Sequence, residues 1–316
     1  MNICILSTSA LIGPHVEDLG RDFPELGVVP YRSPAWVEAL PTAEALIVLL
    51  SEPLTEADLE LCPALRVIGT FSVGTNHLPR AYCRQRGIRI VNTPGVLTDA
   101  TADLALTLLL ALTRRVREGE ALVRSGAWKG WAPDLLLGSG LSGKTCGVLG
   151  SGPIGRAFAR RARAIGLEVI FWDREGTGSP VDIGVGTALR LPLDELLRLS
   201  DVLSLHCPLT GETRGLLTRE KLTLLPGGAF IINTARGGII DETAALDLLD
   251  EGRIGGVGLD VFENEPEIDP RWRTSARTVL LPHLGSATTE TREEMSRLLC
   301  EGVRQALSSR AVPGEL

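Results

Sequence analysis

The sequence has 316 residues, with 32 basic and 39 acidic side chains and a net charge of −7. At roughly 150 residues per domain, this length predicts two domains with a sizeable core. Nucleic acids are held by clustered Lys and Arg, so the acidic balance argues against a nucleic-acid partner. The longest apolar stretch, residues 104–112, is far shorter than the roughly 20 residues that cross a bilayer, so we expect no membrane association.

Cysteine usage and the N-terminus favour a cytoplasmic protein. The six cysteines form no C-x-x-C pair and no Cys/His cluster, so we expect neither a disulfide framework nor a metal site. Residues 1–6 lack the basic segment of a secretory signal and look like the start of a β-strand. Both observations fit a reducing compartment.

Short β-branched runs alternate with longer helical segments along the first third of the chain. A helix start signal at Thr55–Asp58 opens a predicted helix over Thr55–Leu61. The alternation predicts an α/β fold with a largely parallel sheet. The predicted strands are Ile3–Leu6, Ala45–Leu50, Arg66–Gly69 and Ile88–Val91.

A strong breaker at Asn92–Gly95 separates this part from a second α/β series. A long helix is predicted over Thr98–Arg124, because leucines recur there at helical spacing. A terminal helix is predicted over Thr288–Ser308. The two α/β series indicate two α/β units, with a boundary near residues 94–99. The strands predicted in the second series are Thr145–Leu149, Glu168–Trp172, Val202–His206, Ala229–Asn233, Val257–Val261 and Thr278–Leu281.

Residues Gly138–Thr145 match G-x-x-x-x-G-K-[ST], the phosphate loop of nucleoside-triphosphate-binding proteins. That loop needs a helix directly after it, so that the helix N–H groups and the Lys meet the phosphates. Here the next residues, Cys146–Gly150, form a β run with two glycines. We therefore interpret the match as coincidental and expect an exposed turn that leads into a strand.

A second glycine-rich motif, Gly150–Gly155, has the spacing G-x-G-x-x-G. A predicted strand precedes it, a helix over Pro153–Ile165 follows, and Asp173 comes 21 residues after Gly152. In this context the glycines allow a tight turn and a close approach of pyrophosphate, and the helix N-terminus faces the phosphates. The motif therefore predicts a dinucleotide site, with a plain glycine-rich turn as the alternative.

Asp173 also bears on the choice of cofactor. A carboxylate at this strand end accepts hydrogen bonds from the adenosine ribose and repels a 2′-phosphate, which favours NAD. The guanidinium of the adjacent Arg174 would attract such a phosphate, so NADP stays an alternative.

The sequence contains four histidines, and two of them end strands. His283 follows a buried strand, at the end where ligands bind in such sheets, so it is the candidate acid/base group. His206 ends a strand on the predicted cofactor side and would touch adenosine. His15 lies in a surface turn, and His77 is expected to help a helix start.

Six segments in the right order resemble the D-isomer-specific 2-hydroxyacid dehydrogenase family over nearly the whole chain. Two stretches, Val96–Ala102 and Trp128–Leu137, are most similar to the glyoxylate/hydroxypyruvate reductase branch. The six segments are Ser72–Asn76, Asn92–Ala102, Gly150–Gly155, Asn233–Gly238, Gly258–Pro266 and Leu281–Ala287.

The resemblance implies an NAD(H)-dependent enzyme that reduces glyoxylate or hydroxypyruvate to the 2-hydroxy acid by hydride transfer. His283 would be the general acid/base, and Glu265 would hydrogen-bond its other nitrogen and favour the protonated form. Arg236 would hold the substrate carboxylate. By composition alone Glu263, Glu265 and Glu267 are equivalent, and only the family pattern selects Glu265.

The resemblance also assigns binding residues. Asp260 would accept a hydrogen bond from the nicotinamide carboxamide. Pro153 stands where the family often has a long side chain, which would weaken phosphate binding. Substrate contacts are implied for Val73, Gly74, Arg236 and Ser286. Cofactor contacts are implied for Thr101, Gly150, Gly152, Pro153, Ile154, Gly155, Asp173, His206, Pro208, Thr213, Thr234, Ala235, Arg236, Asp260, His283 and Gly285.

The implied fold is α/β, with two Rossmann-like or flavodoxin-like doubly wound parallel-sheet domains and a cleft between them. The substrate-binding domain would be discontinuous, residues 1–95 plus 286–316, and the NAD-binding domain would span residues 96–285. Family members usually form homodimers through the long helix and the loop after it. Trp128 and Trp131 would then anchor the interface, and packing within their own subunit is the alternative.

Two other functions stay open. The same chemistry would serve phosphite or another D-2-hydroxy acid such as phosphoglycerate, although the chain ends at Leu316 without the extension of the larger phosphoglycerate enzymes. A different class is an NAD-sensing corepressor, because one branch of the family binds peptides. The intact set of Arg236, Glu265 and His283 favours an enzyme.

Overall fold

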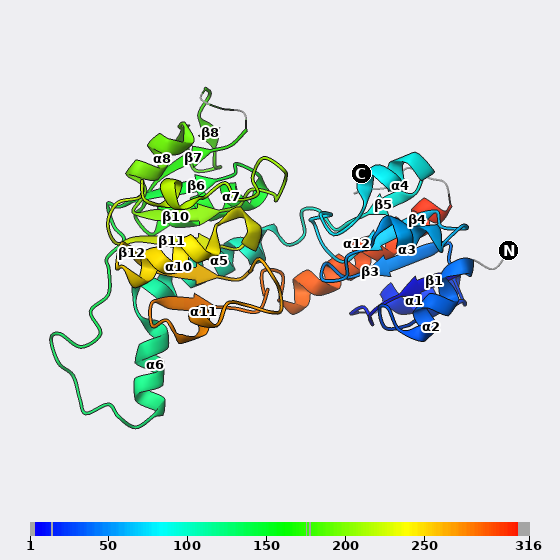
Figure 1. Ribbon diagram of the computed structural model, residues 1–316, viewed down its shortest axis with the longest axis horizontal. Helices are drawn as coiled ribbons and strands as arrows, with labels where there is room; N and C mark the ends of the chain where they lie inside the picture. Colours follow the sequence, from blue (N-terminus) through cyan, green and yellow to red (C-terminus); the bar gives the residue numbers. More distant parts are fainter. Residues whose placement is uncertain (1–3, 14, 175, 177, 309–316) are drawn as a thin grey trace. The chain divides into compact units, whose positions relative to one another are not determined.

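The computed structural model describes residues 4–13, 15–174, 176 and 178–308. The chain divides into two compact units, Met1–Leu97 together with Ser286–Leu316, and Thr98–Gly285 (Figure 1). The first unit is discontinuous in sequence, because the second is inserted before its last helix. Each unit is built on a mainly parallel sheet, so the predicted α/β class is confirmed.

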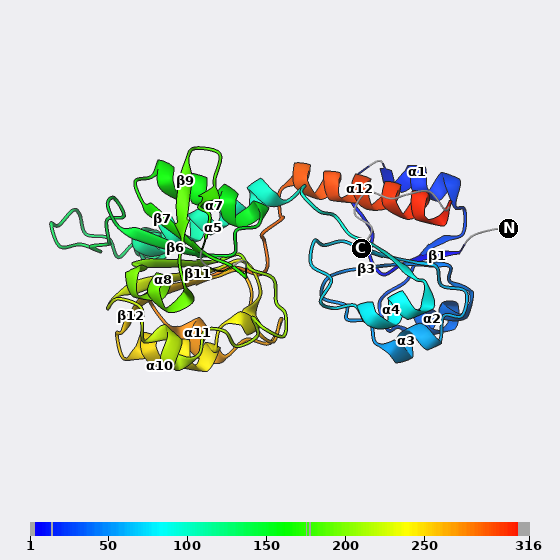
Figure 2. The same cartoon turned by 90° about the horizontal axis from the view of Figure 1, so that it is seen from above.

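The first unit is a five-stranded parallel sheet with helices on both faces. In Figure 2, α1 and α12 lie on one face of the sheet, and α2, α3 and α4 lie on the other. The strands follow the order β2-β1-β3-β4-β5, with β1 Ile5–Ser7, β2 Leu26–Val28, β3 Ala45–Val48, β4 Val67–Thr70 and β5 Arg89–Val91. The helices are α1 His15–Asp22, α2 Pro34–Ala39, α3 Glu56–Glu60, α4 Arg80–Arg86 and α12 Thr289–Leu307, with a 3-10 turn at Leu40–Thr42.

Helix α12 belongs to the first unit because its apolar face completes that unit's core. Met295, Leu299 and Val303 recur every four residues, on one side of the helix, and are buried in one cluster with Ile47 of β3. The packing is close, since a Cβ atom at Gly69 of β4 would lie 2.9 Å from a methyl group of Val303. The last helix of the chain therefore folds with its first strands.

The second unit is an eight-stranded sheet in the order β13-β12-β11-β10-β6-β7-β9-β8. Neighbouring strands are parallel except β8 and β9. The strands are β6 Thr145–Leu149, β7 Glu168–Trp172, β8 Val181–Asp182, β9 Thr187–Arg190, β10 Val202–Leu205, β11 Ala229–Asn233, β12 Ile254–Leu259 and β13 Thr278–Leu280. The helices are α5 Thr98–Thr113, α6 Val116–Arg124, α7 Pro153–Ala164, α8 Leu193–Leu199, α9 Arg219–Leu222, α10 Glu242–Asp250 and α11 Pro270–Thr274, with a 3-10 turn at Gly237–Ile239.

The order of the strands creates a switch point beside β6. From β6 the chain builds β7 and β9 on one side, and it then crosses to β10, which pairs with the other edge of β6. In open α/β sheets, ligands bind at the carboxyl ends of the strands at such a point. Figure 2 shows α5 and α7 on one face of this sheet, and α8 and α10 on the other. Leu108 and Phe158 are buried in one core cluster, and Leu196 and Leu246 in another.

The long helix predicted over Thr98–Arg124 is wrong in one respect. It is two helices, α5 and α6, because Arg115 adopts a left-handed φ of 53° that ends the first and begins the second. Residues 125–144 after α6 contain no helix or strand and form the long loop that extends beside α6 in Figure 1. The short strands β2, β8 and β9 were not predicted.

Two further observations concern the chain as a whole. All six cysteines are free thiols. Across the residues that the structure describes, no helix has the length and apolar character needed to cross a membrane.

Candidate active site

Arg236, Glu265 and His283 lie on loops that leave three neighbouring strands of the second unit. Arg236 follows β11, Glu265 follows β12 and His283 follows β13, and these strands are adjacent in the sheet. The carboxyl ends of parallel strands meet at one edge. The sheet therefore brings together three residues of which the first and last are 47 positions apart in sequence.

A hydrogen bond joins the histidine to the carboxylate. Nδ1 of His283 lies 2.8 Å from Oε2 of Glu265, and Oε1 of Glu265 accepts the N–H of Phe262 at 2.9 Å. Burial raises the pKa of Glu265, but the hydrogen bond to His283 and the charge of its ring outweigh burial and hold that pKa below its usual value. Because Nδ1 is engaged, Nε2 is the nitrogen left to exchange a proton with a ligand.

The backbone of His283 adopts a left-handed φ of 57°, which costs a non-glycine residue roughly 1–3 kcal/mol. Asp260 stabilises this turn. Its backbone carbonyl accepts the N–H of His283 at 2.9 Å, and its two carboxylate oxygens accept the N–H groups of Leu284 and Gly285 at 2.6 and 2.8 Å. Burial raises the pKa of Asp260 despite these bonds.

Asp260 thus has a supporting role that the sequence did not predict. It is buried, and both carboxylate oxygens already accept backbone amides of the turn that presents His283. Its contact with the nicotinamide carboxamide stays a prediction. Thr101 supports the same turn, because its hydroxyl donates to the carbonyl of Gly285 at 3.0 Å.

Arg236 is fixed by Asn233, the last residue of β11. Oδ1 of Asn233 accepts the N–H of Ala235 at 2.9 Å, and Nδ2 donates to the carbonyl of Arg236 at 2.9 Å. The guanidinium also donates to the carbonyl of Ala235 at 2.7 Å. Burial lowers the pKa of Arg236, and the charge of Glu265 opposes that effect, but an arginine stays protonated at any pH of interest.

The loops that carry Arg236 and Glu265 pack backbone against backbone. A Cβ atom at Gly237 would lie 1.9 Å from the carbonyl carbon of Phe262 and 2.1 Å from the nitrogen of Glu263. No side chain fits at that position. Glycine is therefore required beside Arg236 to keep these two loops in contact.

Glu242 and Trp272 are supporting residues that sequence reasoning missed. Glu242 opens α10, and its Oε1 accepts the N–H of Glu263 at 2.7 Å while its Oε2 accepts the indole N–H of the buried Trp272 at 3.1 Å. Burial raises the pKa of Glu242. The carboxylate thereby ties the loop of Glu265 to two helices, α10 and α11, and nothing in the local sequence marks it.

The glycine loop after β6 has the geometry that the motif predicts. Gly150 has a φ of +105°, and a Cβ atom there would lie 2.7 Å from the carbonyl oxygen of His206. A Cβ at Gly155 would lie 2.0 Å from the carbonyl oxygen of Gly150, so α7 packs directly on the loop. At Gly152 a Cβ would meet no atom within 4 Å and φ is −66°, so the protein itself does not require glycine there.

These features fit a dinucleotide. The open space at Gly152 leaves room for a pyrophosphate, and the start of α7 has no side-chain cap among the described residues, so its N–H groups can receive one. The buried hydroxyl of Thr234, at the end of β11, has no hydrogen-bond partner in the described part of the chain.

The match at Gly138–Thr145 is coincidental as predicted, because β6 begins at Thr145 and Nζ of Lys144 donates to Ser139 at 2.6 Å.

Other predicted cofactor residues have internal partners. Nε2 of His206 lies 2.8 Å from the hydroxyl of Ser204, its ring packs on Phe158, and burial lowers its pKa to about 3. The ring is therefore neutral at physiological pH. The hydroxyl of Thr213 donates to the carbonyl of Pro208 at 2.6 Å. Contacts of His206, Pro208 and Thr213 with a cofactor stay predictions.

The predicted substrate residues Val73, Gly74 and Ser286 belong to the first unit. The carbonyls of Val73 and Gly74 accept bonds from Asn92 and Ser72, at 2.8 and 2.6 Å, whereas their N–H groups have no acceptor among the described residues. Such N–H groups suit a carboxylate.

His77, expected at a helix start, instead lies before α4 with Nε2 2.9 Å from the hydroxyl of Thr70.

The fold and the glycine loop define a dinucleotide-binding α/β protein, and comparison with known proteins narrows this class. The family model for the D-isomer specific 2-hydroxyacid dehydrogenase, NAD binding domain, matches residues 106–285. Glyoxylate reductase from Thermococcus litoralis is 42% identical over 271 residues, which cover 84% of this chain and 81% of that protein.

Solved structures agree with this result. The TT0316 protein from Thermus thermophilus is 39% identical with a TM-score of 0.91, covering 99% of this chain and 100% of that chain. An NADPH-dependent glyoxylate/hydroxypyruvate reductase from Sinorhizobium meliloti, solved with NADP and malonate, is 30% identical with a TM-score of 0.89, covering 100% and 97% of the two chains.

The chain therefore belongs to the D-isomer-specific 2-hydroxyacid dehydrogenase family, which confirms the resemblance seen in its sequence. It is an NAD-dependent 2-hydroxyacid dehydrogenase.

Proposed function

We propose that this enzyme reduces glyoxylate or hydroxypyruvate to the corresponding 2-hydroxy acid, with Arg236, Glu265 and His283 as its catalytic residues. The observation that carries the proposal is the 2.8 Å hydrogen bond between His283 and Glu265, on loops beside the one that carries Arg236. The 42% identity to a glyoxylate reductase supports this substrate class.

Each residue has a distinct task in the proposed reaction. Arg236 binds the substrate carboxylate, because its planar guanidinium matches a carboxylate with two parallel hydrogen bonds. His283 donates its Nε2 proton to the carbonyl oxygen as the alcohol forms, and takes it back in oxidation. Glu265 stabilises the protonated imidazole through Nδ1. The bound reduced nicotinamide supplies the hydride.

The first unit contributes further donors in this proposal. The N–H groups of Val73 and Gly74 have no acceptor in the described part of the chain, which supports their role as additional donors to the substrate carboxylate. Ser286 is proposed as a third contact. These assignments follow the family pattern.

Purified protein screened for NADH oxidation tests the proposal. The panel contains glyoxylate, hydroxypyruvate, pyruvate and larger 2-oxo acids, with 3-phosphohydroxypyruvate for the phosphoglycerate alternative. We expect the highest kcat/KM with glyoxylate or hydroxypyruvate and its loss in His283→Ala. The control is His15→Ala, at a half-buried histidine that opens α1 and does not lie in the predicted surface turn, and it should retain this kcat/KM. A higher kcat/KM with 3-phosphohydroxypyruvate would contradict the proposed substrates and favour the phosphoglycerate alternative. Tight NADH binding without any turnover would favour the sensing corepressor.

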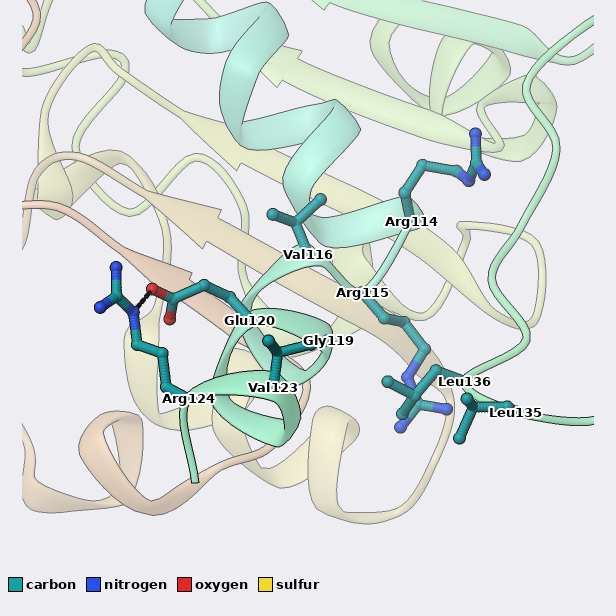
Figure 3. A pocket seen from close by; sticks show the side chains of 9 residues that line it. All are labelled: Arg114, Arg115, Val116, Gly119, Glu120, Val123, Arg124, Leu135 and Leu136. Atoms are coloured by element: carbon teal, nitrogen blue, oxygen red, sulfur yellow. Dashed lines mark hydrogen bonds and ion pairs between the residues drawn. The ribbon is translucent and has the colours of Figure 1, made fainter. Parts of the chain in front are cut away.

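We also propose that the enzyme is a homodimer that associates through α6 and the loop after it. A hollow of about 770 Å³ lies beside α6. Figure 3 shows the side chains that line it, which are Arg114, Arg115, Val116, Gly119, Glu120, Val123, Arg124, Leu135 and Leu136. Apolar side chains stand exposed along the same segment, with Trp131 82% and Leu137 68% exposed. Large exposed apolar side chains gathered in one place are typical of interaction sites.

Light scattering coupled to size-exclusion chromatography tests the dimer. We expect a dimer for the wild-type protein and a larger share of monomer for Trp131→Ser. The control is Leu199→Ser, which removes another exposed apolar side chain, from α8. A monomeric wild-type protein, or a Trp131→Ser variant that stays fully dimeric, would contradict this interface.

A further inference from the structure

The end of β7 holds a buried ion pair that involves the residue assigned to the cofactor ribose. Nη2 of Arg190 lies 3.1 Å from Oδ2 of Asp173, and the two side chains are only 8% and 12% exposed. Arg190 is the last residue of β9 and pairs in register with Phe171 of β7. The sheet itself therefore places this guanidinium beside the carboxylate.

The same oxygen of Asp173 has a second donor. The hydroxyl of Ser151, the residue between the first two glycines of the loop, donates to Oδ2 of Asp173. Asp173 is thus tied on one side to the glycine loop and on the other to β9. Both contacts fix the orientation of its carboxylate.

The ion pair changes the electrostatics of this strand end. An unpaired carboxylate here repels a 2′-phosphate and favours NAD over NADP. In the present structure the charge of Asp173 is matched by the equally buried charge of Arg190. A nearly buried pair is screened little by salt, so the compensation persists at physiological ionic strength.

We infer that Arg190 is a cofactor-selecting residue, which orients Asp173 for the ribose hydroxyls and offsets its charge so that NADP is not excluded. The inference concerns the NAD(P) site and is independent of which 2-oxo acid is reduced. It assigns Arg190 a role that acts through Asp173 and requires no direct contact between Arg190 and the phosphate.

Equilibrium titration of NADH and NADPH fluorescence tests this inference without any substrate. In Arg190→Met, which removes the charge at similar size, the ratio of the NADPH Kd to the NADH Kd is expected to rise on the order of tenfold. Arg190→Lys keeps the charge and should leave the ratio within about twofold of wild type. Arg198→Met removes an exposed arginine from α8 and serves as the matched control.

The coupling to Asp173 is tested by a double variant. If Arg190 acts through the carboxylate, Arg190→Met should no longer change the ratio when Asp173→Asn is also present. Thermal unfolding of each variant without cofactor reports folding separately. If Arg190→Met does not fold, Arg190→Gln, which also removes the charge, carries the test and should raise the same ratio. An equal loss of both affinities in Arg190→Met, or a changed ratio in Arg190→Lys, would overturn the assignment and leave Arg190 a structural residue.

Discussion

The two halves of the eight-stranded sheet hold the proposed catalytic and the proposed nucleotide-binding residues, and they are built differently. At the ends of β11, β12 and β13 the site consists of side chains, with His283 bonded to Glu265 at 2.8 Å. At the end of β6 it consists of backbone, since Gly150 and Gly155 are required by packing and Gly152 leaves open space. In our proposal, catalysis in the first half depends on charged and proton-carrying side chains, and cofactor binding in the second depends on the absence of side-chain atoms at the glycines.

This difference predicts how each half responds to substitution. In the side-chain half, a conservative change that keeps the shape but removes the charge or the proton should abolish activity and spare folding. In the backbone half, adding a single methyl group should be enough to cause damage, and its position decides whether folding or binding suffers.

The largest effect is expected for Arg236, the arginine that we propose binds the substrate carboxylate. Arg236→Ala should lower kcat/KM for glyoxylate by about a hundredfold or more, because the substrate loses its orienting partner. Arg236→Lys should recover only part of the lost kcat/KM, since an ammonium cannot form the bidentate contact. Steady-state kinetics with Arg273→Ala, an exposed arginine on α11, provides the control. Kinetics of Arg236→Ala equal to those of the wild type would refute the assigned role.

The glycine loop offers a matched pair of one-methyl changes. Gly155→Ala places a Cβ 2.0 Å from a carbonyl oxygen, so the free energy of unfolding should fall by roughly 1–3 kcal/mol. Gly152→Ala meets no protein atom within 4 Å, so its stability should be unchanged.

NADH affinity completes this test of the backbone half. Gly152→Ala should weaken NADH binding by on the order of tenfold, because the methyl group occupies the space left for the pyrophosphate. Denaturant unfolding and fluorescence titration measure the two effects separately. Unchanged NADH affinity in Gly152→Ala would show that the pyrophosphate lies elsewhere.

A smaller effect is expected at Glu242, which holds the loop of Glu265 in place. Glu242→Ala removes the acceptor of the Glu263 N–H and leaves the indole N–H of Trp272 buried without a partner. We expect kcat to fall by about tenfold with little change in NADH affinity, because the loop position affects Glu265 and not the glycine loop. Glu242→Gln keeps an acceptor and should recover most of the activity. Equal kcat in Glu242→Ala and wild type would remove this residue from the site.

The smallest effect concerns stability at acidic pH. The pKa of Glu265 is below its usual value of 4.5 in the folded protein, so its ionised form contributes stability above about pH 4.5 and loses it as pH falls through the folded pKa. The contribution is about 1 kcal/mol or less for a partly exposed pair. Denaturant unfolding from pH 7 to pH 3 should show this acid-dependent loss in the wild type and a smaller one in Glu265→Gln. An equal loss of unfolding free energy in the wild type and in Glu265→Gln would contradict this contribution of Glu265.

The two halves also differ in how far the sequence predicted them. The glycine loop was predictable, because tight turns and close approaches require glycine at fixed spacing, and because a strand precedes the loop while a helix and Asp173 follow it. Glu265 could be selected only by resemblance to the family, since Glu263 and Glu267 flank it with the same composition.

Residues that act across long sequence distances were not predicted. Glu242 contacts Trp272 across 30 positions, and Arg190 reaches Asp173 only because β9 pairs beside β7. The break between α5 and α6 occurs at two arginines, without glycine or proline to mark it. Such features depend on tertiary packing, which local sequence patterns do not encode.

The central claim is that His283 donates the proton and that Glu265 stabilises the protonated imidazole. The pH dependence of kcat/KM for glyoxylate reduction tests it most directly. We predict that activity in Glu265→Gln falls to half of its maximum at a lower pH than in the wild type, because the amide no longer favours the protonated imidazole. Normalised profiles that superimpose would contradict the claim.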